Sequence, residues 1–295
     1  MASFGSRTLH RGSLVTVVDV DCAQRASGIG PEEHTTEHTL VFVRAGVFVK
    51  HAPIARRDVL VAEPVHALFL NAHVPYRVSH PTDDGDACTT LRFTTDAVLD
   101  VLGASDPRVE ERRDTPFALS HAPLATEALL RMRALRRAPS TLAADEESLT
   151  LLATVARDAW RAHGVASSAR RPETQRERRD LVERTKERLA ARPTERRTLV
   201  SLARDVGSSP FHLTRVFREL VGMPVHQYLL RLRLTVALER LDGGENVSTV
   251  AHAVGFSSHA HFTDAFRARF GMAPSRCLGS RRTRGVEPEM NADAR

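Results

Sequence analysis

The chain has 295 residues, of which 42% are hydrophobic and 26% are charged, and it carries a formal net charge of +6. This length suits two domains better than one, and the composition is that of an ordinary globular protein. The absence of a long apolar run or a signal-peptide core excludes a membrane-spanning or exported class. Three cysteines at long spacings, Cys22, Cys88 and Cys277, favour reduced thiols. We therefore expect a cytoplasmic protein.

Short apolar or alternating runs between Leu14 and Phe93 predict a strand-rich N-terminal half. Turn residues separate the runs, as at Arg44-Ala-Gly46 and at the Pro81–Asp86 segment. The predicted strands are 14–20, 39–43, 47–50, 59–61, 67–70, 76–78 and 89–93. Many short strands with this punctuation favour a barrel or a sandwich that encloses a pocket.

Helical periodicity follows between Pro123 and His163, and Pro139 divides it into two stripes. We expect these two helices to cover the strands and to pair with a second chain; internal packing alone is the alternative. The Arg136-Arg137 pair at the end of the first stripe is interpreted as solvated. Residues 166–177 lack periodicity and are predicted to be an interdomain linker, and residues 281–295 a disordered tail.

A helical unit occurs twice between Thr198 and Met272. In each copy a short amphipathic helix is followed at once by a glycine, Gly207 or Gly255, and then by a serine that can cap the next helix. The second helix of each copy carries the frame Thr-x-x-Phe-Arg-x-x-x-Gly-Met, which starts at Thr214 and again at Thr263. The repetition predicts two helix-turn-helix units.

The second helix of each unit divides into an apolar face and an outward face. The residues expected to face the core are Leu213, Val216, Phe217 and Leu220 in the first copy, and Phe262, Ala265, Phe266 and Phe270 in the second. Those expected to face outward are Phe211, Thr214, Arg215 and Arg218, then Ala260, Thr263, Asp264 and Arg267. Arginine, threonine and aspartate on such a face can contact base edges in a DNA major groove.

Charge and length support this interpretation. Residues 169–284 hold 22 Arg and one Lys against 12 acidic residues, a net charge of +11, whereas the rest of the chain is acidic. A GC-rich genome would explain arginine in place of lysine but not this asymmetry, which favours phosphate binding. Between the units, a predicted helix from Val225 to Leu241 is roughly 26 Å long, close to the spacing of major grooves along one side of DNA.

Three motifs of this region resemble the DNA-binding module of the AraC/XylS transcriptional regulators. They are Arg233-Leu234-x-x-Ala237-x-x-x-Leu241, Ala251-x-x-x-Gly255-Phe256, and Phe262-x-x-x-Phe266-x-x-x-Phe270-Gly271-Met272-x-Pro274. The resemblance covers about residues 181–278 and implies a seven-helix domain whose third and sixth helices read DNA. It places the base contacts at Phe211, Thr214, Arg215, Ala260, His261, Thr263 and Asp264. Cys277-Leu278 departs from the family pattern.

Ahead of such a module, the N-terminal half resembles the cupin-like sensor domain that many members of the family carry. This likeness rests on His34-x-x-Glu37-His38 and His73-x-Pro75-Tyr76, although the spacing differs from the His-x-His of metal cupins. We predict no cofactor and no metal; if a metal binds, His34, Glu37 and His73 are its candidate ligands, since imidazole and carboxylate suit zinc, iron or nickel. We interpret Cys22 and Cys88 as inert buried thiols rather than as a redox pair.

The expected fold is therefore α+β in two domains. Residues 1–165 form a cupin-like β-barrel with helices, residues 166–177 a linker, and residues 178–280 an all-α domain with two helix-turn-helix units. We expect a sequence-specific transcription regulator and not an enzyme. Its expected partners are double-stranded promoter DNA and an unidentified small-molecule effector, with no membrane. RNA polymerase and a second copy of the chain are candidate partners.

Two alternatives remain at this point. The histidine-rich N-terminal half would also suit a metal-dependent cupin enzyme whose helical half localises it on DNA. Nonspecific nucleoid binding fits the charge but leaves the two distinct outward faces unexplained. The sequence contains no nucleophile elbow, P-loop, dinucleotide glycine motif or CxxC pair that favours an enzyme.

Overall fold

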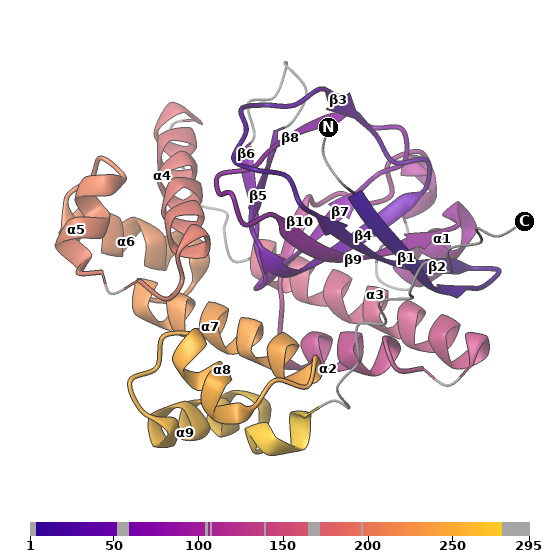
Figure 1. Cartoon of the computed structure of the whole chain (residues 1–295). Coiled ribbons are helices and arrows are strands. Elements are labelled where there is room, and N and C mark those ends of the chain that lie inside the picture. The colour runs from indigo at the N-terminus through magenta and orange to yellow at the C-terminus, as the bar shows by residue number, and fades with distance from the viewer. Residues whose placement is uncertain are drawn as a thin grey trace, which may run out of the picture.

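A strand-rich N-terminal half and an all-helical C-terminal half make up the computed structural model (Figure 1). The structure describes residues 4–51, 59–103, 106, 108–138, 140–164, 172–195 and 197–278. The predicted α+β class, with strands first and a helix-turn-helix region last, is confirmed. Within these residues, no helix is both long enough and apolar enough to cross a lipid bilayer.

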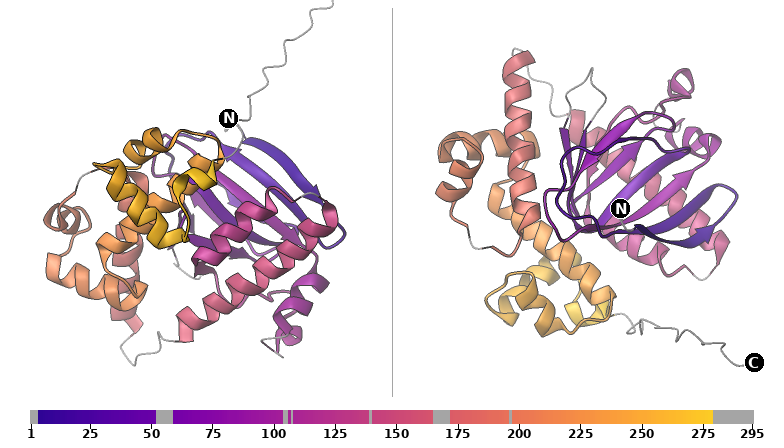
Figure 2. Two further views of the ribbon diagram at one scale, coloured as in Figure 1. Left: turned by 90° about the horizontal axis from the view of Figure 1, so that it is seen from below. Right: turned by 45° about the horizontal axis from the view of Figure 1, so that its top comes forward.

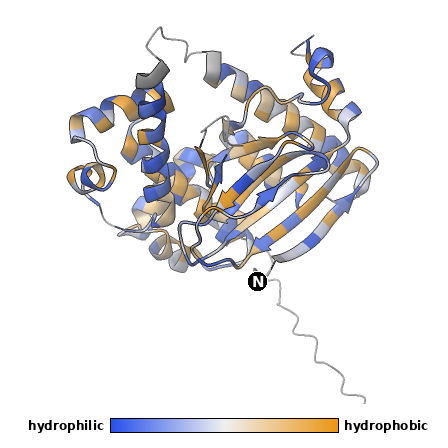
Figure 3. Ribbon diagram, turned by 90° about the horizontal axis from the view of Figure 1, so that it is seen from above, coloured by the Kyte–Doolittle hydropathy of each residue, from blue (hydrophilic) through white to orange (hydrophobic). Residues whose placement is uncertain are grey.

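The strands form two antiparallel sheets that face each other. The larger sheet has the order β1 (Phe4–Arg11), β2 (Val15–Cys22), β9 (Asp86–Phe93), β4 (His38–Gly46), β7 (His66–Leu70) and β10 (His121–Pro123). The smaller sheet has the order β3 (Glu32–Glu33), β8 (Tyr76–Ser79), β5 (Phe48–His51) and β6 (Val59–Ala62). Strand β1 was not predicted, because Phe4–Arg11 has little apolar alternation. Figure 3 shows hydrophilic and hydrophobic residues alternating along strands of the sheets.

The two faces of the larger sheet pack against different partners. One face, which includes Leu40 and Phe93, packs on helices α1 (Thr95–Gly103), α2 (Thr126–Leu135) and α3 (Thr141–Gly164). A short 3-10 helix, Val109–Arg112, follows α1 in the chain and adds Val109 to the same core. The other face, which includes Val41 and Cys88, packs on the smaller sheet. Figure 2 shows α2 and α3 lying across the larger sheet. The two predicted helical stripes therefore do cover the strands.

Lys50 is a mostly buried cation of strand β5. It shares a strand face with Phe48, which packs in the cluster between the two sheets, and its Nζ atom lies 5.5 Å from the centroid of the Tyr76 ring. Burial lowers the pKa of Lys50 to about 8. The unfolded chain, with an ordinary lysine pKa of about 10.4, therefore binds more protons than the folded chain between these two pH values. Stability is expected to rise with pH across this window.

We expect Lys50→Met to raise the free energy of unfolding at pH 7 by about 1–3 kcal/mol, because the folded state no longer buries a charge. The gain should shrink as the pH approaches about 10, where the wild-type lysine is largely neutral in the folded state. Urea denaturation at the two pH values measures both effects. A destabilised variant at pH 7 would mean that contact with the Tyr76 ring outweighs the burial penalty.

The C-terminal half contains six α-helices and a short 3-10 helix within the described residues. They are α4 (Pro172–Ala191), α5 (Leu199–Asp205), α6 (Pro210–Val221), α7 (Val225–Asp242), α8 (Val247–Ala253), α9 (His259–Phe270) and Pro274–Cys277. Helix α4 begins inside the segment 166–177 where a linker is expected, so the second half of that segment is helical. Residues 165–171 and the expected tail 281–295 lie outside the described residues.

Helix α7 contributes to the hydrophobic core of both halves. Near its start, Tyr228 and Leu232 are buried in a cluster that joins α4, α5 and α6 to Val49 of β5 and Val61 of β6. Further along, Leu238 belongs to a second cluster, which combines α2 and α3 with α8 and α9. Figure 1 shows α7 between α5–α6 on one side and α8–α9 on the other. The apolar cores of the two halves are therefore continuous.

Candidate nucleic-acid interface

Serine side chains fix the start of both predicted recognition helices, α6 and α9. The hydroxyl of Ser209 accepts a hydrogen bond from the backbone N–H of His212 at 3.2 Å, and Pro210 occupies the first helical position. Ser258 caps α9 in the same way, accepting from the N–H of His261 at 3.2 Å. The sequence predicted both caps, because each serine stands just before an apolar periodic run.

A left-handed glycine makes each turn between the paired helices. Gly207 has a φ of 68° and Gly255 a φ of 86°, a conformation that glycine adopts without the steric cost of a Cβ atom. At Gly255 a Cβ atom would also lie 3.1 Å from the Cα atom of Thr194 and from the guanidinium carbon of Arg233. At position 255, any other amino acid would be strained by the positive φ, and its Cβ atom would crowd its neighbours.

Arg233 of α7 joins the two helix-turn-helix units. Its Nε atom donates to the carbonyl oxygen of Pro193, in the segment between α4 and α5, at 2.6 Å. Its Nη1 atom donates to the carbonyl oxygen of Gly255, in the turn of the second unit, at 3.3 Å. Although Arg233 begins the first of the three family motifs, the sequence assigned it no role. Its role in the structure is to hold the two units in a fixed relation.

The inward faces of α6 and α9 are filled by large apolar side chains. Phe217, Phe262 and Phe266 are fully buried, and the rings of Phe266 and Phe270 lie 4.5 Å apart between centroids. Leu220, which was expected to face the core, is instead 40% exposed. Leu220 lies in the last turn of α6. Helical periodicity predicts which side of a helix is apolar, but it does not show how much of that side the neighbouring helices cover.

The predicted DNA-contacting residues all lie on the exposed or half-buried sides of α6 and α9. Phe211, Arg215, Arg218, Ala260, His261, Asp264 and Arg267 are exposed, and Thr214 and Thr263 are half-buried. The Thr214 hydroxyl hydrogen-bonds to carbonyl oxygens within its own helix, including that of Pro210 at 3.1 Å. Among the described residues, no ion pair involves Arg215, Arg218 or Arg267. Their guanidinium groups are therefore available to a ligand outside the chain.

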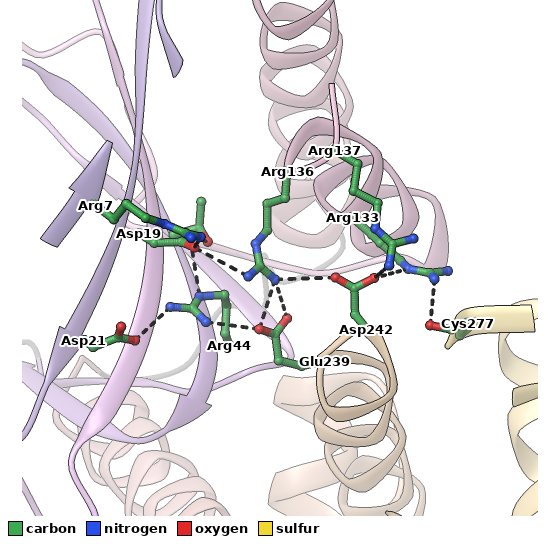
Figure 4. Close-up of polar contacts among 11 residues, drawn as sticks. Arg7, Asp19, Asp21, Arg44, Arg133, Arg136, Arg137, Glu239, Asp242 and Cys277 are labelled. Carbon is green, nitrogen blue, oxygen red and sulfur yellow. Dashed lines mark hydrogen bonds and ion pairs between the residues drawn. The ribbon is translucent and has the colours of Figure 1, made fainter. Parts of the chain in front are cut away.

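An interdomain ion-pair network connects α7 to the N-terminal half (Figure 4). It consists of Asp19, Arg44, Arg133, Arg136, Arg137, Glu239 and Asp242. Glu239 of α7 accepts from Nη1 of Arg44 at 3.1 Å and from Nη1 of Arg136 at 2.8 Å. One turn later on α7, Asp242 accepts from Nε of Arg133 at 2.5 Å. The network thus attaches the N-terminal half to the helix that separates the two units.

The interpretation of Arg136 as solvated is wrong, whereas Arg137 is exposed as expected. The Arg136 side chain is only 14% exposed, and it binds both Glu239 and the buried Asp19. Arg137 pairs with Asp242 at 2.5 Å. The carboxylates that bind Arg136 come from positions about a hundred residues away on either side, so periodicity around the two arginines carried no sign of them.

A second polar contact between the halves is centred on Glu63, which follows β6 and is completely buried. Its carboxylate accepts from Nδ1 of His66 at 2.5 Å, from the hydroxyl of Tyr228 on α7 at 2.5 Å, and from the N–H of Val65 at 3.0 Å. Burial alone would raise the pKa of Glu63, but interactions with His66, Lys186 and Tyr228 bring it below its ordinary value. Glu63 is thus held as a carboxylate between strand and helix.

The three candidate metal ligands do not come together. The rings of His34 and His73 lie 6.2 Å apart between centroids, and both residues are exposed. Glu37 shares no set of converging ligand atoms with either histidine within the part of the chain that is described. These three residues therefore do not form one set of converging ligands in the described part of the chain.

A small hollow lies between the two halves, beside the interdomain ion-pair network. Its apolar lining comes from strand β4 and helix α2 of the N-terminal half and from Leu238 of α7. Arg44, Arg133, Arg136 and Glu239 supply charged groups at the same place. The hollow is therefore lined by side chains from both halves.

Residues 202–279 match the family model described as "Helix-turn-helix domain". The chain is 36% identical over 83 residues to the HTH-type transcriptional activator AarP of Providencia stuartii, covering 28% of this chain and 62% of AarP. It is 43% identical over 63 residues to the activator RhaS of Pectobacterium carotovorum, covering 21% of this chain and 23% of RhaS. The chain thus covers less than two thirds of either relative. Among solved structures, apo ToxT of Vibrio cholerae aligns over 90% of this chain and 97% of its own, with 10% identity and a TM-score of 0.41.

Proposed function

Residues 202–279 are a helix-turn-helix domain of the AraC type, and from this premise we propose that the whole chain is a cytoplasmic, sequence-specific transcription regulator and not an enzyme. The observation that carries the proposal is the pair of capped helices, α6 and α9, whose outward faces leave Arg215, Arg218 and Arg267 without an ion pair inside the described chain. Double-stranded promoter DNA is the proposed partner.

In the proposed complex, α6 and α9 enter two successive major grooves. Helix α7 has 18 residues and is therefore roughly 27 Å long, whereas successive major grooves on one side of DNA are about 34 Å apart. The link that Arg233 makes to both units supports this geometry, because it favours one fixed separation between them. Asp264 on α9 repels phosphate, so we expect α6 to carry more of the base recognition.

The N-terminal half is proposed to regulate DNA binding by sensing a small effector or by mediating dimerisation. An effector changes DNA affinity only if it binds more tightly to one arrangement of the two halves than to another. The contacts that differ between such arrangements would include those of Arg44 and Arg136 with Glu239. The hollow beside them is a candidate effector site because residues of both halves line it.

A hydroxyl-radical footprint tests the proposal directly. We expect the full chain to protect two patches on one face of the DNA upstream of its own gene, about one helical turn apart. Protection without pattern that disappears steeply with added salt would instead indicate nonspecific binding and would contradict the proposal. A parallel sedimentation measurement with and without DNA reports whether one or two copies of the chain bind.

Arg215→Ala is expected to weaken binding to the specific site by about 1–3 kcal/mol, because Arg215 has an exposed guanidinium group on the outward face of α6. Affinity for random DNA should change much less. Titrations on the footprinted site and on scrambled DNA, at equal salt, measure both. Arg161→Ala, which removes an exposed arginine from α3, is the matched control and should change neither. Equal losses on both DNAs for Arg215→Ala would make Arg215 a phosphate contact instead.

A further inference from the structure

Three side chains that can bind metal converge at one end of the space between the two sheets. Cys22 at the end of β2 pairs across the larger sheet with Asp86 at the start of β9. His80 follows β8 of the smaller sheet, and its Nε2 atom lies 3.7 Å from Sγ of Cys22 and 3.1 Å from Oδ2 of Asp86. One ligand atom from each residue lies within 4.8 Å of the others, which no other set of three described residues achieves.

These separations are those of ligands around one small cation. Zinc binds sulfur at about 2.3 Å and nitrogen or oxygen at about 2.0–2.2 Å in a tetrahedron, so neighbouring ligand atoms lie roughly 3.3–3.7 Å apart. The two distances from His80 bracket this range. The thiol of Cys88, two residues after Asp86 on β9, donates to the other carboxylate oxygen, Oδ1 of Asp86, at 3.4 Å and does not belong to the converging set. The set offers a thiol that metal binding would deprotonate, an imidazole and a carboxylate, which are ligand types that zinc takes.

Hydrogen bonding alone does not account well for this group. The side chains of His80 and Asp86 are 6% and 7% exposed, and Cys22 is 6% exposed. Within the described residues, neither arginine nor lysine pairs with the Asp86 carboxylate, and Nδ1 of His80 is buried without a partner. A buried carboxylate normally has a cation or several strong donors around it. Asp86 is held by the imidazole of His80 and the thiol of Cys88, neither of which is a permanent cation, and a metal ion would supply one.

We propose that Cys22, His80 and Asp86 bind a divalent metal ion of the zinc class. The site differs from the expected set His34, Glu37 and His73, and it unites the two sheets at one end. Its position is linked to the rest of the chain, because Asp21, the neighbour of Cys22, pairs with Arg44 of the interdomain ion-pair network.

The test uses the full-length chain, freed of metal with a chelator under reducing conditions and titrated with Co²⁺. We expect one equivalent to bind and to produce a thiolate-to-cobalt charge-transfer band, which one equivalent of Zn²⁺ then abolishes. Cys22→Ser and His80→Gln should each lower the Co²⁺ affinity at least about 10-fold, as losses in a metal site commonly do. Cys88→Ser should keep the charge-transfer band, because Cys22 supplies the thiolate. Cys277→Ser removes a buried cysteine that packs in the core with α7 and α9 and is not part of the cluster, and it should bind like the wild type.

Circular dichroism of each variant shows whether it is folded, and the melting temperature gives a second readout. Zn²⁺ should raise the melting temperature of the wild type and of Cys277→Ser but not that of Cys22→Ser. Absence of stoichiometric Co²⁺ binding by the wild type would overturn the proposal, as would a band that persists in Cys22→Ser. Because these measurements contain no DNA, they succeed or fail independently of the proposed function.

Discussion

Glu63→Ala is expected to lower the free energy of unfolding by about 3–5 kcal/mol, the usual cost of removing one partner from a buried charged group. The wild-type carboxylate accepts from His66, Tyr228 and the N–H of Val65 in a completely buried place. Alanine leaves all three buried donors without an acceptor. Each donor has then lost its hydrogen bonds to water without compensation, which destabilises the folded state. Urea denaturation followed by circular dichroism measures the loss.

Two controls separate this effect from the general cost of a substitution. Glu63→Gln keeps one acceptor oxygen and should lose less than Glu63→Ala, whereas Glu32→Ala changes an exposed glutamate and should stay within about 0.5 kcal/mol of the wild type. A loss below about 1 kcal/mol for Glu63→Ala would show that water enters the site and replaces the carboxylate.

The same group predicts an acid dependence. The pKa of Glu63 is lower in the folded chain than its ordinary value of about 4.3, so the unfolded chain takes up the proton first as the pH falls. The stability that Glu63 contributes is therefore fully present above about pH 4.3 and is lost as the pH falls through the folded-state pKa. Glu63→Gln should show a weaker fall in stability over this range than the wild type.

Phe266→Ala and Phe217→Ala are each expected to cost about 3–5 kcal/mol, because each removes a fully buried ring from the small core of one helix-turn-helix unit. Phe266 packs between Phe262 and Phe270, at centroid distances of 5.6 Å and 4.5 Å. Phe217 packs edge-on against the Tyr228 ring of α7 at 5.3 Å. The cavities cannot close easily, since helices surround both rings. Thermal and urea denaturation measure the loss.

Phe211→Ala is the matched control, since it removes the same side chain from the same helix as Phe217 but at a position that is 77% exposed. Its unfolding free energy should stay within about 0.5 kcal/mol of the wild type. If Phe211→Ala is as costly as Phe217→Ala, the assignment of inward and outward faces of α6 is wrong. A footprint of the Phe266→Ala variant, at a temperature where it stays folded, should lose protection mainly in the patch assigned to α9.

The helix-turn-helix units could be predicted from the sequence because their determinants are local. Periodic apolar residues, the capping serines Ser209 and Ser258 and the turn glycines all lie within a few residues of the structure they specify. The same logic located most strands. It missed β1, whose pairing with β2 is not visible as alternation in its own residues.

The contacts between distant segments could not be predicted in this way. Arg136 meets Glu239 across 103 positions, and His80 meets Cys22 across 58. Strand periodicity predicts that β2 and β9 exist, but only the register that places Cys22 opposite Asp86 brings the thiol and the carboxylate together. The cupin-like motifs that selected His34, Glu37 and His73 carry no information about this register, so they did not point to the cluster that converges.

The burial of α7 in two clusters also bears on how such chains are inherited. Leu238 and Glu239 of α7 contact the N-terminal half, and Tyr228 reaches Glu63 within it. Recombination that joined this helix-turn-helix region to an unrelated sensor would expose Leu238 to water and leave Glu239 and Tyr228 without their partners. A successful exchange would require compensating substitutions on one face of α7. We therefore expect the residues on this face of α7 to vary together with the sensor domain to which the DNA-binding region is joined.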